Sequence, residues 1–250
     1  TYPYGMVQFT PSYFSKRSGF VINQLSGGGC EHMGNFPTFP VKGKLKMSPD
    51  NILNYRINIS EEKGHAGYYE AMVQEDIKAK LTVTERTGMA SYEYPADQQY
   101  GTVIIGGGIS ATPIEQAAIV ITAPNKCEGY AEGGNFCGLR TPYKVYFVAE
   151  FDTDALESGT WKRNELKPNT TFAEGEYSGV YFTFDVNKKK NIQYKIGVSY
   201  VSVENARENL KAENTGWDFV QIQSQAEAKW NHYLSKIEVE GTNPDRTTQF

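Results

Sequence analysis

Apolar and polar residues alternate along most of the chain before Ser202, which is the pattern of β-strands that bury one face. The segment Lys144–Phe151 is the clearest case, because apolar Val, Phe, Ala and Phe occupy every second position. Many short strands separated by turn residues are typical of a β-sandwich, and about a dozen of them predict a large one. Similar runs predict strands at Met6–Thr10, Lys42–Met47, Tyr55–Ser60, Tyr68–Gln74, Ile77–Thr84, Met89–Tyr94, Thr102–Ile105, Ala117–Thr122, Val180–Val186 and Ile192–Val201.

Near the C-terminal end, apolar residues recur at three- and four-residue steps instead, which predicts helices at Ser202–Asn214 and Asp218–Ile237. The second helix opens with Asp218 followed three residues later by Gln221, which fits a capping box. These helices either cap the edge of the sandwich or lead into a further domain. The fold class predicted from the residues is therefore all-β, a large sandwich with C-terminal helices.

Composition limits the function classes. The chain has 250 residues, 39% apolar and 13% aromatic, which is enough to bury a core. Its net charge is −4 and its longest basic cluster is Lys188–Lys190, so we expect no nucleic-acid partner. No apolar run approaches the ~20 residues of a membrane span. The first residues, Thr1–Met6, carry neither an initiator Met nor a signal peptide, so we expect a piece of a longer protein.

The three cysteines lie at spacings that match no zinc or redox motif. Cys127 and Cys137 could pair across a glycine-rich loop, which would leave Cys30 free. A second glycine-rich stretch that includes Cys137, Gly133–Gly138, favours a structural bend over a ligand contact.

The most distinctive stretch is Asn23–Asn35, where three glycines at 27–29 are followed by Cys30, Glu31 and His32. Glycine costs conformational entropy, so a run of glycines indicates a sharp bend or a close approach of backbone to a ligand. Polar side chains set into such a bend favour a ligand-facing loop. A mobile linker is the plainer alternative, whereas a phosphate-binding loop would need a following Gly-Lys-Ser/Thr motif, which is absent.

A second polar stretch contains Glu61, Glu62 and His65 and is predicted to be a loop. Paired carboxylates can act as an acid and a base, but neighbouring ones more often form a solvated turn. For Glu62 and His65 the functional interpretation and the solvated turn remain evenly matched, while Glu61 favours the turn. The chain has only 3 histidines, and none sits in a nucleophile elbow or a zinc-binding helix motif. The residues alone therefore give no complete catalytic set.

Short segments spread over nearly the whole chain match one known family in the same order. They are Tyr4–Gln8 with Pro11, Gly19–Phe20, Leu25–Gly27 with Gly29–Cys30 and Gly34, Glu62 with Gly67–Tyr69, Lys80–Thr82 with Thr84–Gly88, Phe136–Gly138, Tyr143–Phe147, Gly159–Trp161, Lys195–Ser202, Ala206 with Asn209–Leu210, and Trp230 with Leu234–Gly241. These segments resemble the amino-terminal domain of glycoside hydrolase family 92 α-mannosidases. The family pattern has His, Thr and Asp where this chain has Gln24, Gly28 and Asn35.

The resemblance implies a galactose-mutarotase-like β-supersandwich over residues 1–201. Residues 202–250 would be a helical segment that closes this domain and leads to an (α/α)6 catalytic domain outside the chain. It implies a calcium-dependent, inverting exo-α-mannosidase in which the catalytic carboxylates and most calcium ligands belong to that second domain. This chain would then hold no catalytic or metal-binding residue, and would form one wall of the mannoside pocket.

The residues that the resemblance leads us to expect in contact with substrate are Gly29, Cys30, Glu31, His32, Glu62 and His65. We expect the loop Ser26–Asn35 to project from one edge of the sandwich toward the second domain. Cys30, Glu31 and His32 would then lie near the tip of this loop.

The resemblance also implies α-mannoside glycans as partners and a periplasmic or extracellular location. Two other function classes stay open. A free-standing carbohydrate-binding or adhesion module would show an aromatic platform on an exposed strand face. A galactose-mutarotase-like epimerase would need its own acid and base on a concave sheet, for which the sequence offers no convincing pair.

Overall fold

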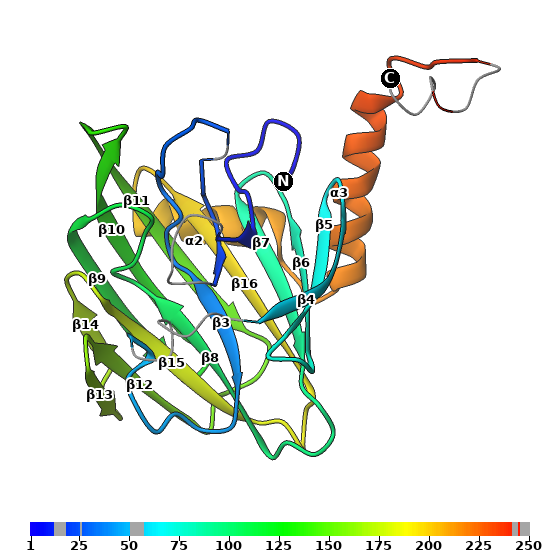
Figure 1. Cartoon of the computed structure of the whole chain (residues 1–250). Helices are drawn as coiled ribbons and strands as arrows, with labels where there is room; N and C mark the ends of the chain where they lie inside the picture. Colours follow the sequence, from blue (N-terminus) through cyan, green and yellow to red (C-terminus); the bar gives the residue numbers. More distant parts are fainter. Residues whose placement is uncertain (13–18, 26, 51–57, 242–244, 246–250) are drawn as a thin grey trace.

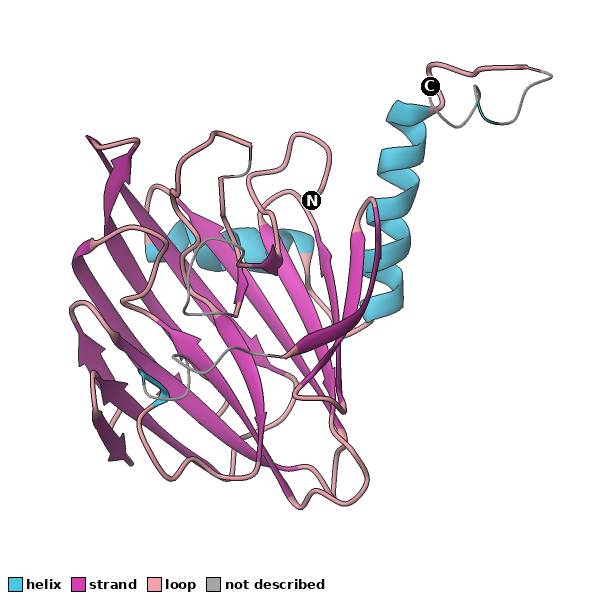
Figure 2. Cartoon of the chain, in the orientation of Figure 1, coloured by secondary structure: helices cyan, strands magenta, loops and turns pink. Residues whose placement is uncertain are grey.

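The computed structural model describes residues 1–12, 19–25, 27–50, 58–241 and 245. Within these residues the chain forms two antiparallel β-sheets that enclose one core, with two helices following the last strand (Figures 1 and 2). The predicted all-β sandwich with C-terminal helices is confirmed.

One sheet has seven strands in the order β1-β2-β3-β8-β15-β12-β13. The strands are β1 (Thr10–Pro11), β2 (Phe20–Val21), β3 (Thr38–Lys42), β8 (Tyr100–Gly106), β12 (Glu157–Lys162), β13 (Glu165–Pro168) and β15 (Ser178–Asp185).

The other sheet has nine strands in the order β14-β9-β10-β11-β16-β7-β6-β5-β4. Its strands are β4 (Ile59–His65), β5 (Tyr68–Val73), β6 (Ile77–Val83), β7 (Thr87–Glu93), β9 (Ile114–Ala123), β10 (Lys126–Phe136), β11 (Leu139–Phe151), β14 (Phe172–Glu174) and β16 (Asn191–Ser199). The hairpin of β10 and β11 is long, and it extends beyond its neighbours at the upper left of Figure 1.

The core lies between the sheets; strand β10 buries every second residue over most of its length, whereas β8 and β15 are buried at nearly every position. Phe151 of β11 packs against Phe182 and Phe184 of β15, with ring centroids 5.0 Å apart in both pairs. Burying a side chain of this kind stabilises the fold by roughly 1.5–3 kcal/mol relative to leaving it in water. Where apolar residues alternate along a strand, as in β10, the apolar positions face this shared interior.

Two helices cover part of the outer face of the nine-stranded sheet: α2 (Val203–Glu213) over β16 and β11, and α3 (Phe219–Leu234) over β5, β6 and β7. Both predicted helices are confirmed. The Asp218 side chain accepts a hydrogen bond from the Gln221 backbone N–H at 2.9 Å, so the predicted cap is present. Glycine allows the close packing: a Cβ on Gly197 would lie 2.5 Å from the carbonyl oxygen of Ala206 in α2.

Two of the predicted strands are wrong in place. The strand predicted at Lys42–Met47 instead ends at Lys42, because Gly43 turns the chain with a φ of 75°. The strand predicted at Met6–Thr10 is reduced to the short β1. Residues 55–57 of the strand predicted at Tyr55–Ser60 lie outside the described residues, whereas Ile59 and Ser60 begin β4, which runs from Ile59 to His65. The polar stretch predicted as a loop is thus an edge strand.

Several strands have no counterpart among the predicted ones, notably β10, β12, β13 and β14. Strand β10 contains Gly129, Gly133 and Gly134, which weaken its strand pattern. The structure needs glycine there, because a Cβ on Gly129 would lie 2.1 Å from the Ala118 carbonyl oxygen of β9. In this strand glycine marks close approach of neighbouring backbones, as well as the irregular register between Gly133 and Asn135.

Candidate functional site

The glycine-rich loop lies between β2 and β3, at the end of the sandwich where the β10–β11 hairpin turns. The last turn of α3 points toward this same end (Figure 1). Gly27, Gly28, Gly29 and Glu31 are exposed there. The prediction that the loop projects from one edge of the sandwich agrees with this placement.

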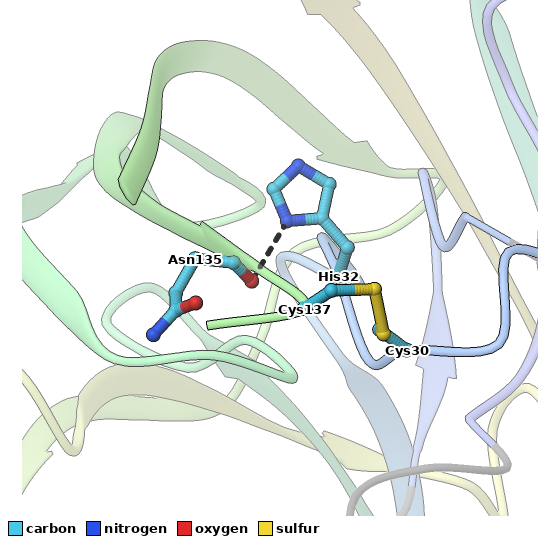
Figure 3. The surroundings of a disulfide bond; sticks show 4 residues. All are labelled: Cys30, His32, Asn135 and Cys137. Carbon is cyan, nitrogen blue, oxygen red and sulfur yellow. Dashed lines mark hydrogen bonds between the residues drawn. A yellow bond between two sulfur atoms is a disulfide. The ribbon is translucent and has the colours of Figure 1, made fainter. Parts of the chain in front are cut away.

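A disulfide ties the loop to the hairpin: Cys30 is bonded to Cys137, 107 residues further along the chain (Figure 3). The alternative pairing of Cys127 with Cys137 is therefore wrong. Cys127 lies near the start of β10, and Cys137 lies just after its end. Ten residues at ~3.3 Å each place the two cysteines about 33 Å apart. Cys127 is buried in the core, and burial raises the pKa of its thiol well above the usual range.

His32 lies beneath the loop, with only 7% of its surface exposed, so the expectation of a tip position is wrong. Its ring contacts Phe136 and Tyr143 edge-on, with centroids 5.4 Å away in both cases. Its Nδ1 atom lies 3.3 Å from the backbone carbonyl oxygen of Asn135 (Figure 3). His32 therefore anchors the loop to the same hairpin that holds the disulfide.

A buried amide network closes the base of the loop. Asn23 donates from Nδ2 to Asn35 Oδ1 at 3.0 Å, and its own Oδ1 accepts from the Asn35 backbone N–H at 2.7 Å. Tyr143 donates to the same Asn35 Oδ1 at 2.7 Å, and burial is the main cause that raises the Tyr143 pKa to about 12. The paired backbone and side-chain bonds fix the distance between the two arms of the loop.

Gln24 and Asn35, two positions where the chain departs from the family pattern, lie in or beside this network. Both are buried, and both Gln24 amide atoms lack a hydrogen-bond partner among the described residues. Unpaired buried amide atoms cost roughly 1–3 kcal/mol. These two departures therefore lie in the buried support of the loop, whereas the third, Gly28, is exposed.

The exposed glycines serve the loop in two different ways. Gly29 has a φ of 78° and open space around the position of a Cβ, so its lack of a side chain permits a left-handed turn. A Cβ on Gly28 would instead lie 3.1 Å from the ring of Phe136, so the hairpin limits the size of the residue at this position. Gly27, Gly28 and Gly29 therefore expose backbone without side chains, two residues before the exposed Glu31.

Glu62 and His65 lie on the edge strand β4. Glu62 accepts a hydrogen bond from the Tyr69 hydroxyl at 2.7 Å. His65 stacks on Tyr68, with centroids 5.2 Å apart, and its Nε2 lies 3.4 Å from the Glu227 carboxylate of α3. The His65 contacts therefore link the edge of the sheet to the helix.

The structure separates the predicted site residues into two groups. Cys30 and His32 are held by the β10–β11 hairpin, while Glu62 and His65 lie on β4. Five strand intervals separate β11 from β4 in the sheet, which corresponds to about 24 Å at ~4.8 Å per interval. The resemblance led us to expect all of them in one pocket wall. The order of segments along the chain gives no lateral distance between strands of a sheet, so only the structure could separate them.

No group of three or more His, Cys, Asp or Glu side chains that could hold a metal ion occurs among the described residues. Among the same residues, none of the helices combines the length and the apolar character needed to cross a membrane.

Comparison with known proteins gives a consistent relationship. Residues 1–199 match the glycosyl hydrolase family 92 N-terminal domain, and residues 205–250 match the glycosyl hydrolase family 92 catalytic domain. An uncharacterised secreted glycosidase of Arthroderma benhamiae is 24% identical over 249 residues, which covers 89% of this chain and 32% of that protein.

Two solved structures share the fold. A family GH92 α-mannosidase from Bacteroides thetaiotaomicron has a TM-score of 0.82 at 23% identity, covering 96% of this chain and 36% of that one. A family GH92 inverting mannosidase from Bacteroides thetaiotaomicron VPI-5482 has a TM-score of 0.75 at 22% identity, and the match covers 97% of this chain and 34% of that one. The chain spans about a third of the length of these relatives.

Proposed function

Because the chain belongs to glycoside hydrolase family 92, we propose that it is the amino-terminal, non-catalytic part of a calcium-dependent, inverting exo-α-mannosidase. The observation that carries the proposal is the continuous match, from the N-terminal domain into the start of the catalytic domain at residue 205. Relatives of the same fold bear the names α-mannosidase and inverting mannosidase. A free-standing binding module would not continue into a catalytic domain, so the enzyme is the better supported function.

In this proposal the glycine-rich loop forms one wall of the mannoside pocket. The exposed backbone of Gly29 and the carboxylate of Glu31 would contact the sugar, since backbone groups and carboxylates bind hydroxyls directionally. Cys30 and His32 would hold this wall in place through the disulfide and the ring contacts. Glu62 and His65, further along the sheet, would face a more distant part of the glycan, on the aglycone side.

Proton transfer is assigned to the catalytic domain. An inverting glycosidase needs a general acid and a general base roughly 6.5–9.5 Å apart, so that a water molecule fits between the base and the sugar. We place these carboxylates and the calcium ligands beyond the described residues, which contain no metal-binding cluster. The domain division proposed is a β-supersandwich over 1–201 and a helical segment over 202–250 that leads into the (α/α)6 domain.

We place the protein in the periplasm or outside the cell. Disulfides persist in oxidising compartments and are rare in the cytosol, and Cys30 is bonded to Cys137. The related Arthroderma protein carries the name of a secreted glycosidase, which supports the same location.

The test compares this chain alone with the longer protein that contains it, on an aryl α-mannoside. The longer protein should release mannose, lose activity when calcium is chelated and regain it on calcium addition, and NMR should show the β-anomer first. The isolated chain should be inactive. Chelator-sensitive turnover by the isolated chain would place the chemistry in this half, and an inactive longer protein on every α-mannoside would overturn the proposal.

The wall assignment has its own test in the longer protein. Glu31→Ala should lower kcat/KM by about tenfold to a hundredfold, because a hydrogen bond to substrate is lost. Gly29→Val should lower it further, since a β-branched side chain resists a φ of 78° and fills the open space in front of the loop. Parental kinetics in both variants would remove this loop from the pocket.

A further inference from the structure

A separate hollow lies on the outer face of the nine-stranded sheet, at the end away from the glycine-rich loop. It has a volume of about 580 Å³ and is lined by Asp152, Lys189, Lys190, Asn191, Gln193 and Trp217. Strand β11 has 13 residues, and it joins the hairpin turn at Leu139 to the segment that carries Asp152. At ~3.3 Å per residue the hollow is about 40 Å from the disulfide. It is thus distinct from the proposed pocket wall.

Trp217 forms an aromatic wall of the hollow and is held rigidly. The ring packs against a small apolar cluster that contains Met89 and Phe219. The Lys195 ammonium lies 4.4 Å from the ring centroid, and this ammonium also donates to the Asn214 carbonyl oxygen at 3.0 Å. Trp217 is partly exposed, and an aromatic side chain that its neighbours already hold loses little entropy when a ligand packs against its exposed part.

Polar groups line the floor beside the ring. Asn191 and Gln193 are two residues apart on β16, so their side chains project from the same face of the sheet. Asn191 Oδ1 accepts from the Ser91 hydroxyl at 2.7 Å, which orients the amide and leaves its N–H2 group available. No described residue forms a hydrogen bond with the Gln193 side-chain amide or the Trp217 indole N–H, so both remain available to a ligand.

An ion pair holds two further side chains that line the hollow. Asp152, whose side chain is 5% exposed, pairs with Lys189 at 2.7 Å and accepts from the Gln193 backbone N–H at 3.1 Å. Because this pair is neutral, Lys190 at the rim is the lining side chain that keeps an unpaired charge. The hollow therefore presents an aromatic surface, amide donors and acceptors, and little net charge.

We propose that this hollow is a second saccharide-binding site, which holds a hexose unit of a neutral glycan while the proposed catalytic pocket acts elsewhere on the polymer. The apolar C–H face of a hexose packs on an aromatic ring, and its hydroxyls pair with side-chain amides and an indole N–H. A volume of about 580 Å³ is within the usual range for such ligands. The choice of mannan as the first probe rests on the proposed function.

The test uses the longer protein in native gels that contain soluble α-mannan, with parallel gels that contain glucan, galactan or xylan. Trp217→Ala and Gln193→Ala should each weaken retention in the binding gel by about tenfold. Hydrolysis of a small aryl α-mannoside should stay within about twofold, because the hollow is far from the pocket. The matched control is Tyr146→Ala, which removes a partly exposed ring from β11 on the same sheet face and should leave retention unchanged.

Several results would overturn the inference. They are an absence of retention in every gel, retention that both variants leave unchanged, and a loss that Tyr146→Ala reproduces. Near-UV circular dichroism shows whether a variant is misfolded. Gln193→Ala should stay folded, because it leaves the apolar cluster that packs against Trp217 intact. A loss confined to a misfolded Trp217→Ala, with Gln193→Ala at parental retention, would also overturn it. Failure of the proposed function would show separately, as absence of aryl-mannoside hydrolysis by the parental protein.

Discussion

At the scale of single residues, His32 and its neighbour Glu31 differ sharply although they are adjacent in the sequence. Glu31 is exposed, whereas His32 is enclosed by Phe136 and Tyr143. An exposed side chain can contact a ligand without supporting the fold. A buried ring with contacts on two sides supports the fold first, and influences a ligand by holding the loop.

We therefore predict different stability effects for these two residues. His32→Ala should lower the free energy of unfolding by about 2 kcal/mol, since it removes a buried ring, while Glu31→Ala should change it by less than ~0.5 kcal/mol. Urea denaturation followed by tryptophan fluorescence measures both. Equal midpoints for the two variants would mean that the aromatic contacts of His32 contribute nothing.

At the scale of elements, the disulfide joins the loop after β2 to the turn between β10 and β11. It closes a sequence separation of 107 residues, so it restricts the unfolded chain strongly. The Cys30→Ser, Cys137→Ser double variant should lose roughly 2–5 kcal/mol of stability. Dithiothreitol should lower the urea midpoint of the parental protein and leave that of the double variant unchanged, and an insensitive parental protein would contradict the prediction.

Helix α2 and strand β16 meet at a glycine, and this contact permits a second prediction at the same scale. Gly197→Ala should destabilise the fold by about 1–3 kcal/mol, because its Cβ would lie 2.5 Å from a carbonyl oxygen of α2. Gly216→Ala is the matched control, as a Cβ there has nothing within 4 Å. Thermal unfolding compares them, and similar melting temperatures would show that α2 shifts at no cost.

At the scale of the whole molecule, the sandwich buries tyrosines between its sheets. Burial raises the pKa of Tyr92, Tyr94 and Tyr194 above the usual range, and raises that of Tyr143 to about 12. In the unfolded chain a tyrosine titrates near ~10. The folded state therefore favours the neutral phenol, and the stability that this provides is complete below about pH 10.

Stability should consequently fall as pH rises from about 10 toward 12, because the unfolded chain ionises first. Each such group contributes a slope of at most ~1.4 kcal/mol per pH unit. Urea midpoints across this range, with phenolate absorbance at high pH, measure the effect. Tyr143→Phe should give a shallower decline than the parental protein, and a constant midpoint up to pH 12 would exclude this mechanism.

Local patterns in the sequence determined the fold class, about half of the strand positions, both helices and the cap at Asp218. These features depend on side-chain alternation or on contacts three and four residues apart, so they are written into short segments. The family resemblance likewise rested on short segments in a fixed order. The exposed Gly27–Gly29 strip was recognisable for the same reason, since its glycines are consecutive.

Only the tertiary structure decided which cysteines pair, which loop residues are buried and how far apart the candidate groups lie. Cys30 meets Cys137 because the sheet brings a hairpin turn to the loop, and no local signal encodes that contact. His32 is polar, yet three contacts from the hairpin enclose it. Most of strand β4 was not predicted, because an edge strand with exposed faces needs no apolar alternation. Long-range packing, which the sequence specifies only through the complete fold, set each of these outcomes.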